Sequence, residues 1–178
     1  MAGGRVVDDY RKANNTVTET AALFSSARDD TPSLITKLID ENKKLVRRVR
    51  ELDQIACQVE AEDMLRGATA EGSTEESPRI ISKIFNDRDG DSLKHLALAL
   101  VAQAGVIALL ASRDHDTARL VFARSADASG DMNALMRRAC EMIDGRGGGK
   151  PELAQGGGKH IAALDDALQT AARSLVSQ

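Results

Sequence analysis

The chain has 178 residues, of which 42% are hydrophobic and 29% charged, and its formal net charge is −3. The apolar share suffices for a buried core. The 2% of aromatic residues and the negative charge argue against base-stacking platforms and bulk electrostatic binding of nucleic acid, so only local basic patches remain for that purpose. Two cysteines far apart exclude a disulfide framework or metal cluster. Without a long apolar run or a secretory signal, we expect a cytoplasmic protein without membrane contacts.

Two helices are predicted at the start of the chain. The first covers about residues 6–25 and has a polar middle. Thr31 and Pro32 then suit the N-cap and the first position of a second helix, because proline lacks the N–H that has no partner there. This second run continues to Arg66 without glycine or proline, and Gly67 is expected to end it.

The second predicted helix carries a heptad pattern. Apolar residues recur every seven positions along two lines, and Asn42 interrupts one of them, as polar residues that fix register in coiled coils do. The pattern predicts a two-helix coiled coil, formed either with the first helix or with a second copy of the chain. An amphipathic helix packed on its own domain is the alternative. If the chain is a homodimer, the expected contact residues are Leu38, Asn42, Leu45, Val49, Leu52 and Val59.

A run of positive charge lies in the middle of the same helix. Lys43, Lys44 and Arg47, followed by Arg48 and Arg50, form the densest basic patch of the sequence. Such a run is usually a solvated helix face. If it contacts phosphates instead, each contact adds salt dependence to the binding.

The composition changes after residue 66. Residues 67–78 are small, polar and acidic, which is typical of a linker. We therefore expect a helical hairpin or coiled coil over 1–66, a linker over 67–78, and an α/β domain over 79–178.

The third segment predicts a mixed sheet. The expected elements are strands at 79–85, 105–111 and 118–124, and helices at about 91–101, 131–143 and 161–175, with Asp91 or Ser92 as the cap of the first helix. A strand–helix–strand unit followed by a hairpin combines parallel and antiparallel pairs. The fold class is therefore α/β, with long N-terminal helices followed by a small mixed-sheet domain that has helices on its faces.

Glycine is concentrated near the end of the chain. Seven of the 14 glycines lie within residues 145–158. We interpret this run as a loop whose successive N–H groups form an anion site, with added charge from Arg146, Lys150 and Lys159. A flexible linker is the alternative. Neither GxxxxGK[ST] nor GxGxxG matches the run, and both motifs require a preceding strand where a helix is predicted here.

Within this run, residues 147–157 resemble the signature of the DHH-associated domain. That domain occurs at the C-terminus of alanyl-tRNA synthetases and of long-form, free-standing alanyl-tRNA editing proteins, and it accompanies some DHH phosphoesterases. Residues 122–125 and 130–132 resemble the stretch before the run in editing proteins, and residues 2–11 resemble the segment that leaves their editing domain. The resemblance thus covers almost the whole chain.

The resemblance implies a non-catalytic C-terminal module that binds and positions tRNA, with alanine tRNA as the expected partner. Hydrolysis of mischarged tRNA would take place in an editing domain outside this chain. The candidate nucleic-acid-binding residues are Arg146, Gly147, Gly148, Gly149, Lys150, Gln155, Gly156, Gly157, Gly158, Lys159, His160, Lys43, Lys44 and Arg47. For His160, an exposed residue before a helix is the alternative.

No metal or other cofactor is expected in this segment. Editing domains of the resembled family bind zinc through His-x-x-x-His and Cys-x-x-x-His pairs, and no histidine or cysteine of this sequence has a partner at that spacing. Zinc is expected only in the absent editing domain. Two other functions remain open: a dimerisation scaffold for that domain, and the substrate-binding domain of a DHH-type phosphoesterase.

Two further groups of residues have ordinary structural explanations. Asp114, His115 and Asp116 resemble a metal or acid/base site, but between two strands they favour a turn. Arg124, at the end of a predicted strand, either faces a ligand cleft or forms a structural ion pair.

Overall fold

The computed structural model describes residues 2–69 and 78–176, so residues 70–77 of the predicted linker lie outside the described part. Contacts divide the chain into two compact units, Met1–Arg50 and Glu51–Gln178. Helix α2 (Thr31–Thr69) passes through this boundary without interruption. Among the described residues, no helix is both long and apolar enough to cross a membrane.

The first unit contains helix α1 (Ala2–Leu23) and the first half of α2, joined through a 3-10 turn at Arg28–Asp30. The prediction of two helices is confirmed, but the predicted N-cap is wrong. Thr31 has helical angles (φ −54°, ψ −45°) because the 3-10 turn leads directly into α2. Its hydroxyl instead donates to the Ala27 carbonyl at 3.2 Å. Helix α2 also continues past Gly67 to Thr69.

The heptad positions of α2 remain uncovered. The exposed fractions of Leu38, Leu45 and Val49 are 53%, 65% and 63%. Asn42 is exposed as well, so α1 does not cover this part of α2 within the first unit. Leu52 and Val59, which continue the pattern in the second unit, are also exposed. The heptad residues therefore form an apolar stripe without a partner in the described chain.

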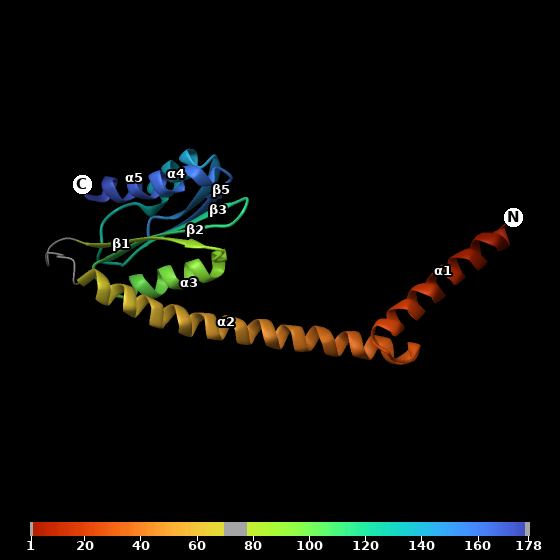
Figure 1. Cartoon of the computed structure of the whole chain (residues 1–178). Helices are drawn as coiled ribbons and strands as arrows, with labels where there is room; N and C mark the ends of the chain where they lie inside the picture. Colours follow the sequence, from red (N-terminus) through yellow and green to blue (C-terminus); the bar gives the residue numbers. More distant parts are fainter. Residues whose placement is uncertain (1, 70–77, 177–178) are drawn as a thin grey trace. The chain divides into compact units, whose positions relative to one another are not determined.

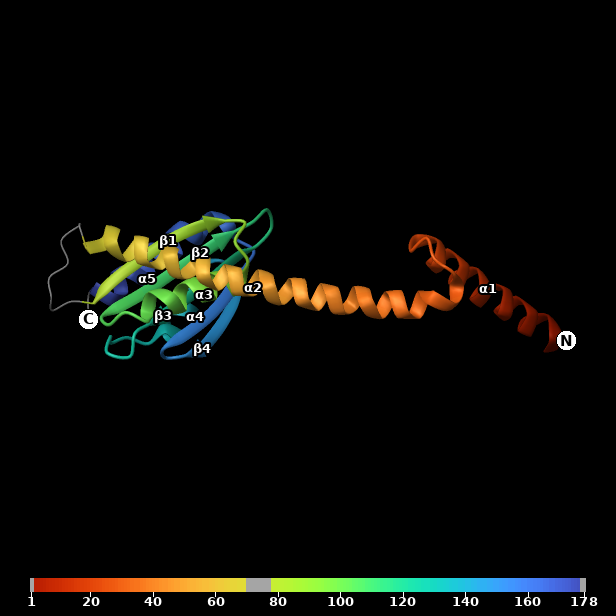
Figure 2. The ribbon, with the colours of Figure 1, turned by 90° about the horizontal axis from the view of Figure 1, so that it is seen from below.

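The second unit contains a five-stranded mixed sheet with the strand order β1-β2-β3-β5-β4. Strands β1 and β2 are parallel and the other neighbours are antiparallel, and β1 and β4 form the two edges in Figure 2. The elements are β1 (Arg79–Asn86), α3 (Gly90–Val101), β2 (Val106–Arg113), β3 (Ala118–Arg124), α4 (Met132–Met142), β4 (Gly145–Lys150), β5 (Leu153–Gly158), a 3-10 turn (Ile161–Ala163) and α5 (Leu164–Val176). The predicted α/β fold with a mixed sheet is confirmed.

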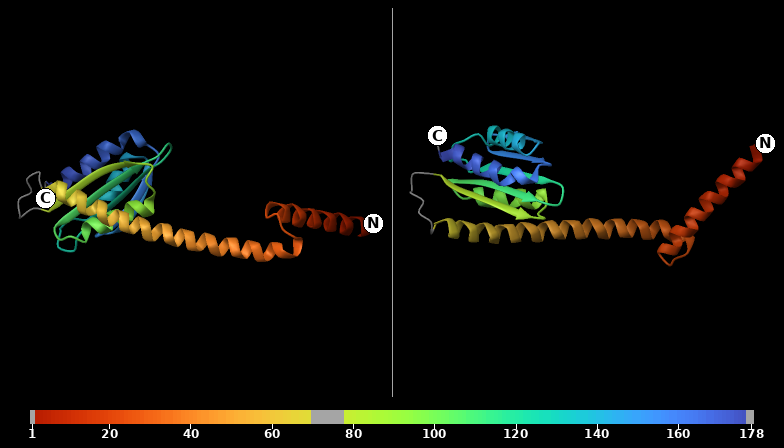
Figure 3. Two further views of the ribbon diagram at one scale, coloured as in Figure 1. Left: turned by 60° about the horizontal axis from the view of Figure 1, so that its bottom comes forward. Right: turned by 45° about the horizontal axis from the view of Figure 1, so that its top comes forward.

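Helices cover both faces of the sheet (Figures 1 and 3). Alternate side chains of a strand point to opposite faces, and β2 is apolar at nearly every position, so both of its faces are buried. Ile107 and Leu109 pack with Phe122 against α4 and α5. Ala108 and Leu110 pack against α3 and the end of α2 on the other face.

Two sequence-based expectations for this unit are wrong. Helix α3 is capped by Asp89, whose carboxylate accepts from the Ser92 N–H at 2.8 Å, and not by Asp91 or Ser92. The glycine-rich run forms the paired strands β4 and β5, joined by Pro151 and Glu152, and not a loop.

Candidate nucleic-acid interface

Close packing against α4 requires glycine at two positions of β4 and β5. A Cβ atom on Gly156 would meet the sulfur atoms of Cys140 and Met136 in α4, and one on Gly147 would lie 2.7 Å from Cys140 Sγ. Neither glycine has a positive φ, so the missing side chain, and not an unusual backbone conformation, decides these positions. The two-stranded ribbon thereby lies directly on helix α4.

The pairing of β4 with β5 also changes which groups of the glycine-rich run could bind an anion. Backbone groups that face a neighbouring strand are bonded within the sheet, so the run does not present a concave row of free N–H groups. The N–H of Gly149, on the edge strand, donates to Asn133 Oδ1 of α4 at 3.0 Å. The run is therefore a pair of strands and not the predicted loop, and we expect anion binding at this ribbon to depend on side chains.

The tip of the ribbon is fixed by its neighbours. Met132 N–H donates to the Pro151 carbonyl and Arg124 N–H to the Glu152 carbonyl, both at 3.0 Å. The Arg124 guanidinium donates to the carbonyls of Gly130 and Ala128 at 2.9 and 2.8 Å. Arg124 therefore has a structural role, and the ribbon is held in one position relative to α4.

The sheet surface opposite α4 brings basic residues together. Arg146, Gly157 and Arg119 lie directly opposite one another across β4, β5 and β3. Directly opposite residues share a face, and the neighbouring pair Gly147–Gly156 faces α4, so this row faces away from it. The two arginines lie two strand spacings apart, about 10 Å. Gly157 lies between them, and because it has no side chain, the sheet surface is not covered at that point.

A hollow of about 460 Å³ lies over this row. It is lined by Thr117, Ala118, Arg119, Asp144, Gly145, Arg146, Gly157, Gly158 and Lys159. Arg146 and Lys159 are exposed. The cationic side chains of Arg119, Arg146 and Lys159 thus surround a surface of glycine residues. Asp144 contributes the one carboxylate of the lining.

Arg119 is held by the turn that precedes β3. Asp114 Oδ2 accepts from Arg119 Nη1 at 2.7 Å, and Asp114 Oδ1 accepts from the N–H groups of Asp116 and Thr117. The guanidinium, followed by these turn bonds, holds the pKa of Asp114 well below its ordinary value. The turn interpretation of residues 114–116 is therefore confirmed, and Asp114 stays ionised and orients Arg119.

The other predicted nucleic-acid-binding residues lie in two separate places, some on or next to the ribbon and some on α2. Lys150 and Gln155 are exposed on the same ribbon, and His160 is exposed just beyond β5, where its N–H donates to the Ile143 carbonyl. Lys43, Lys44 and Arg47 are exposed on α2 in the other compact unit. Sequence reasoning missed Arg119 and Asn133, because only the strand register and the packing of α4 bring them to the ribbon.

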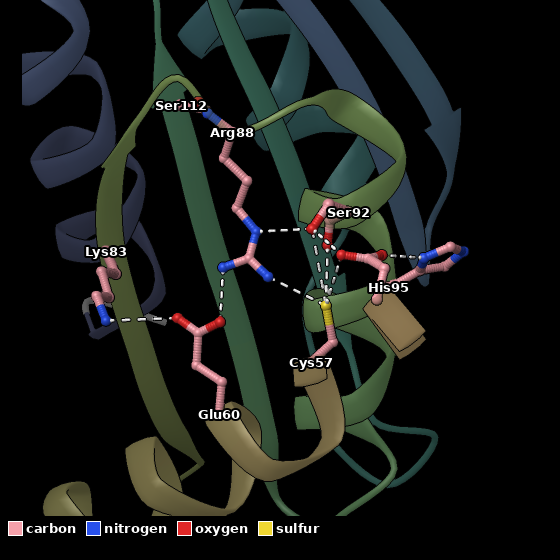
Figure 4. Close-up of polar contacts among 8 residues, drawn as sticks. Cys57, Glu60, Lys83, Arg88, Ser92, His95 and Ser112 are labelled. Atoms are coloured by element: carbon pink, nitrogen blue, oxygen red, sulfur yellow. Dashed lines mark hydrogen bonds and ion pairs between the residues drawn. The ribbon is translucent and has the colours of Figure 1, made fainter. Parts of the chain in front are cut away.

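A second polar cluster joins α2 to the domain (Figure 4). Arg88 donates to Glu60 Oε2 at 2.7 Å, to Ser92 Oγ at 3.0 Å and to Cys57 Sγ at 3.0 Å. Lys83 Nζ also lies 3.7 Å from Glu60 Oε1. Burial raises the pKa of the Cys57 thiol, so it stays neutral. This cluster fastens the second half of α2 to β1 and α3.

Asp53 and His95 extend the cluster. Asp53 Oδ1 accepts from Ser92 Oγ at 2.6 Å, and Asp53 Oδ2 lies 2.8 Å from His95 Nδ1. Burial alone would raise the pKa of Asp53. The bonds from His95 and Ser92 and the nearby positive charge outweigh this effect, so the pKa lies below the ordinary value of 3.8.

The lowered pKa of Asp53 predicts a pH-dependent stability. A carboxyl group with a depressed folded-state pKa stabilises the fold above its ordinary pKa, and this stabilisation is lost as the pH falls through the folded-state value. We expect Asp53→Asn to be less stable than the native chain at neutral pH, and the difference in unfolding free energy to shrink below about pH 4. Urea unfolding across a pH series measures this difference. A difference that stays constant down to about pH 3 would contradict the assignment.

Comparison with known proteins shows the family. The DHHA1 domain model matches residues 77–177. An alanine–tRNA ligase of Pseudomonas syringae pv. syringae is 30% identical over 174 residues, which cover 96% of this chain and 20% of the relative. That of Leptospira borgpetersenii serovar Hardjo-bovis is 40% identical over 100 residues, which cover 52% of this chain and 10% of the relative. The chain thus spans about a fifth or less of the length of these curated relatives.

A solved structure agrees with the fold. The C-Ala domain of Aquifex aeolicus alanyl-tRNA synthetase superimposes with a TM-score of 0.52 at 24% identity, covering 58% of this chain and 98% of that domain. This likeness shows a shared fold. Since the family model matches more than half of the chain, the resemblance found in the glycine-rich run is confirmed, and the chain belongs to the DHHA1 domain family.

Proposed function

We propose that the chain is a non-catalytic tRNA-binding and positioning module of a protein related to alanyl-tRNA synthetases. The observation that carries this proposal is the row Arg146–Gly157–Arg119, with Lys159 beside it, around an open hollow. The alanine–tRNA ligases among the relatives favour alanine tRNA as the partner.

Binding would use the sugar-phosphate backbone of the RNA. Arginine forms paired hydrogen bonds with phosphate, and a glycine floor admits the backbone without steric hindrance. Lys150 and Gln155, exposed on the same ribbon, extend the contacts to neighbouring phosphates and ribose hydroxyls. Catalysis, and the zinc that it would need, belongs in this proposal to a different part of the protein.

The proposal predicts how single substitutions change tRNA binding. Arg146→Ala and Lys150→Ala each remove one phosphate contact, so the slope of log affinity against log salt should fall by about 1. Gly148→Val should also weaken binding, while the fold survives because the nearest atom to a Cβ at this site is Asn133 Oδ1 at 3.4 Å. Filter binding at several salt concentrations measures these effects.

Arg138→Ala is the matched control, since Arg138 is exposed on α4 and lies outside the hollow. Its salt slope should equal that of the native chain. If the Arg146 and Lys150 variants bind alanine tRNA as tightly as the control variant at low salt, the ribbon is not the interface.

Dimerisation is the second candidate function, and the exposed heptad stripe of α2 favours it. One heptad position is occupied by leucine, and the other contains the β-branched residues Ile35 and Val49. This combination favours a parallel pair of helices, in which Asn42 contacts Asn42 of the second copy. We expect light scattering to give twice the chain mass, and Leu45→Asp to give the mass of one chain. A single-chain mass at high concentration of the native protein would rule out this function.

A further inference from the structure

A second hollow lies between α2 and α3, and it shares no lining residue with the hollow beside the ribbon. Its volume is about 360 Å³, within the range of small-ligand sites. The lining consists of Gln54 and Gln58 from α2, His95, Leu98 and Ala99 from α3, and Ala102 directly after α3. All of these residues belong to the second compact unit.

His95 is oriented toward this groove by the polar cluster. Its Nδ1 lies 2.8 Å from Asp53 Oδ2, and an ionised carboxylate can only accept, so Nδ1 carries a proton. In the neutral imidazole, Nε2 is then an acceptor available to a ligand. Figure 4 shows the His95 ring at the border of the cluster, directed away from Arg88 and Ser92.

The rest of the lining suits a small, flat and uncharged group. Gln54 and Gln58 lie one helical turn apart, and each amide offers both donors and an acceptor. Leu98, with an exposed fraction of 43%, provides an apolar contact beside the small side chains of Ala99 and Ala102. The lining contains no carboxylate or ammonium group, so a charged ligand would find no fixed counter-charge there.

These features match a nucleobase. Glutamine amides pair with the donor and acceptor edges of bases, and the flat faces of unstacked bases pack on side chains. An extended peptide would need a free strand edge or a longer groove, whereas this one spans about one turn of α2. We propose that the groove between α2 and α3 binds one unstacked nucleobase, which under the proposed function is supplied by the bound RNA.

The three histidines of the chain allow a direct test, because each gives its own imidazole resonance: His95 in the groove, His160 beside the ribbon and His115 in the β2–β3 turn. The native chain is titrated by NMR with adenosine, guanosine, cytidine and uridine, which carry no phosphate, and separately with ribose 5-phosphate. We expect at least one nucleoside to shift His95 in a saturable manner and to leave His115 unchanged. Ribose 5-phosphate should not shift His95. If no nucleoside shifts His95, or if ribose 5-phosphate shifts it equally, the groove does not recognise a base.

A pair of glutamine variants locates the binding. Gln58→Ala should weaken the nucleoside response of His95 about tenfold, since one amide–base pair is lost. Gln103→Ala is the matched control, because Gln103 lies just beyond α3 and outside the groove, and it should respond as the native chain does. Equal responses of the two variants would overturn the proposal.

The same titrations separate this inference from the proposed function. If nucleosides shift His95 but tRNA does not bind to the chain, the groove is a base-binding site and the tRNA-binding proposal fails. If tRNA binds with the predicted salt dependence and no nucleoside shifts His95, the proposed function stands and the groove inference fails.

Discussion

Gly156→Val is expected to destabilise the second unit by about 3 kcal/mol, as overpacking in a filled core does. A Cβ atom on Gly156 would meet Cys140 Sγ and would lie 2.9 Å from Met136 Sδ. Both sulfur atoms belong to buried side chains of α4, so the ribbon and the helix must separate to admit the new side chain. Urea unfolding measures the loss.

Gly148→Ala is the matched control on the same ribbon, and its unfolding free energy should stay within about 0.5 kcal/mol of the native value. A second check uses Cys140→Ala, which removes one of the two sulfur atoms. The combination of Gly156→Ala with Cys140→Ala should cost less than the sum of the two single changes. Equal stability of Gly156→Val and Gly148→Ala would contradict the close packing of the ribbon on α4.

Arg88→Ala is expected to lower the unfolding free energy by about 2–3 kcal/mol, because it leaves partly buried acceptors without a donor. The Arg88 side chain is 16% exposed and supplies bonds to Glu60, Ser92 and Cys57. Glu60 and Cys57 belong to α2, so the second half of α2 should also lose protection from amide hydrogen exchange.

The control for this prediction is Arg138→Ala, which removes an exposed arginine of α4 and should change the unfolding free energy by less than about 0.5 kcal/mol. Arg88→Lys keeps the charge but not the two-pronged guanidinium group. Its unfolding free energy should lie between the values of Arg88→Ala and Arg138→Ala. If exchange protection in α2 is the same in Arg88→Ala as in the native chain, the cluster does not fasten the helix.

The sequence predicted the elements whose signal is local. The apolar run that became β2 identified a buried strand, and the aspartates at 114 and 116 identified a turn. The paired strands β4 and β5 were missed, because glycine has low strand propensity and no side chain that could alternate between two faces. At Gly147 and Gly156 helix α4 lies so close that only glycine fits, and this requirement is a property of tertiary packing.

The candidate site was predictable only where its residues are neighbours in the sequence. Arg146 and Lys159 flank glycines in the sequence, so their positive charge was visible beside the run. Arg119 joins them only through the register of β3 with β5, which no local pattern reveals. The contact between Arg88 and Glu60 joins residues 28 positions apart, and neither residue belongs to a recognisable pattern.

Titration of this chain with labelled alanine tRNA and a control tRNA, at two salt concentrations, tests directly whether the chain binds tRNA. We expect binding that weakens as salt increases, as phosphate contacts require, and that weakens further in the Arg146→Ala variant. Absence of binding even at low salt would contradict the tRNA-binding role and would favour dimerisation through α2 instead.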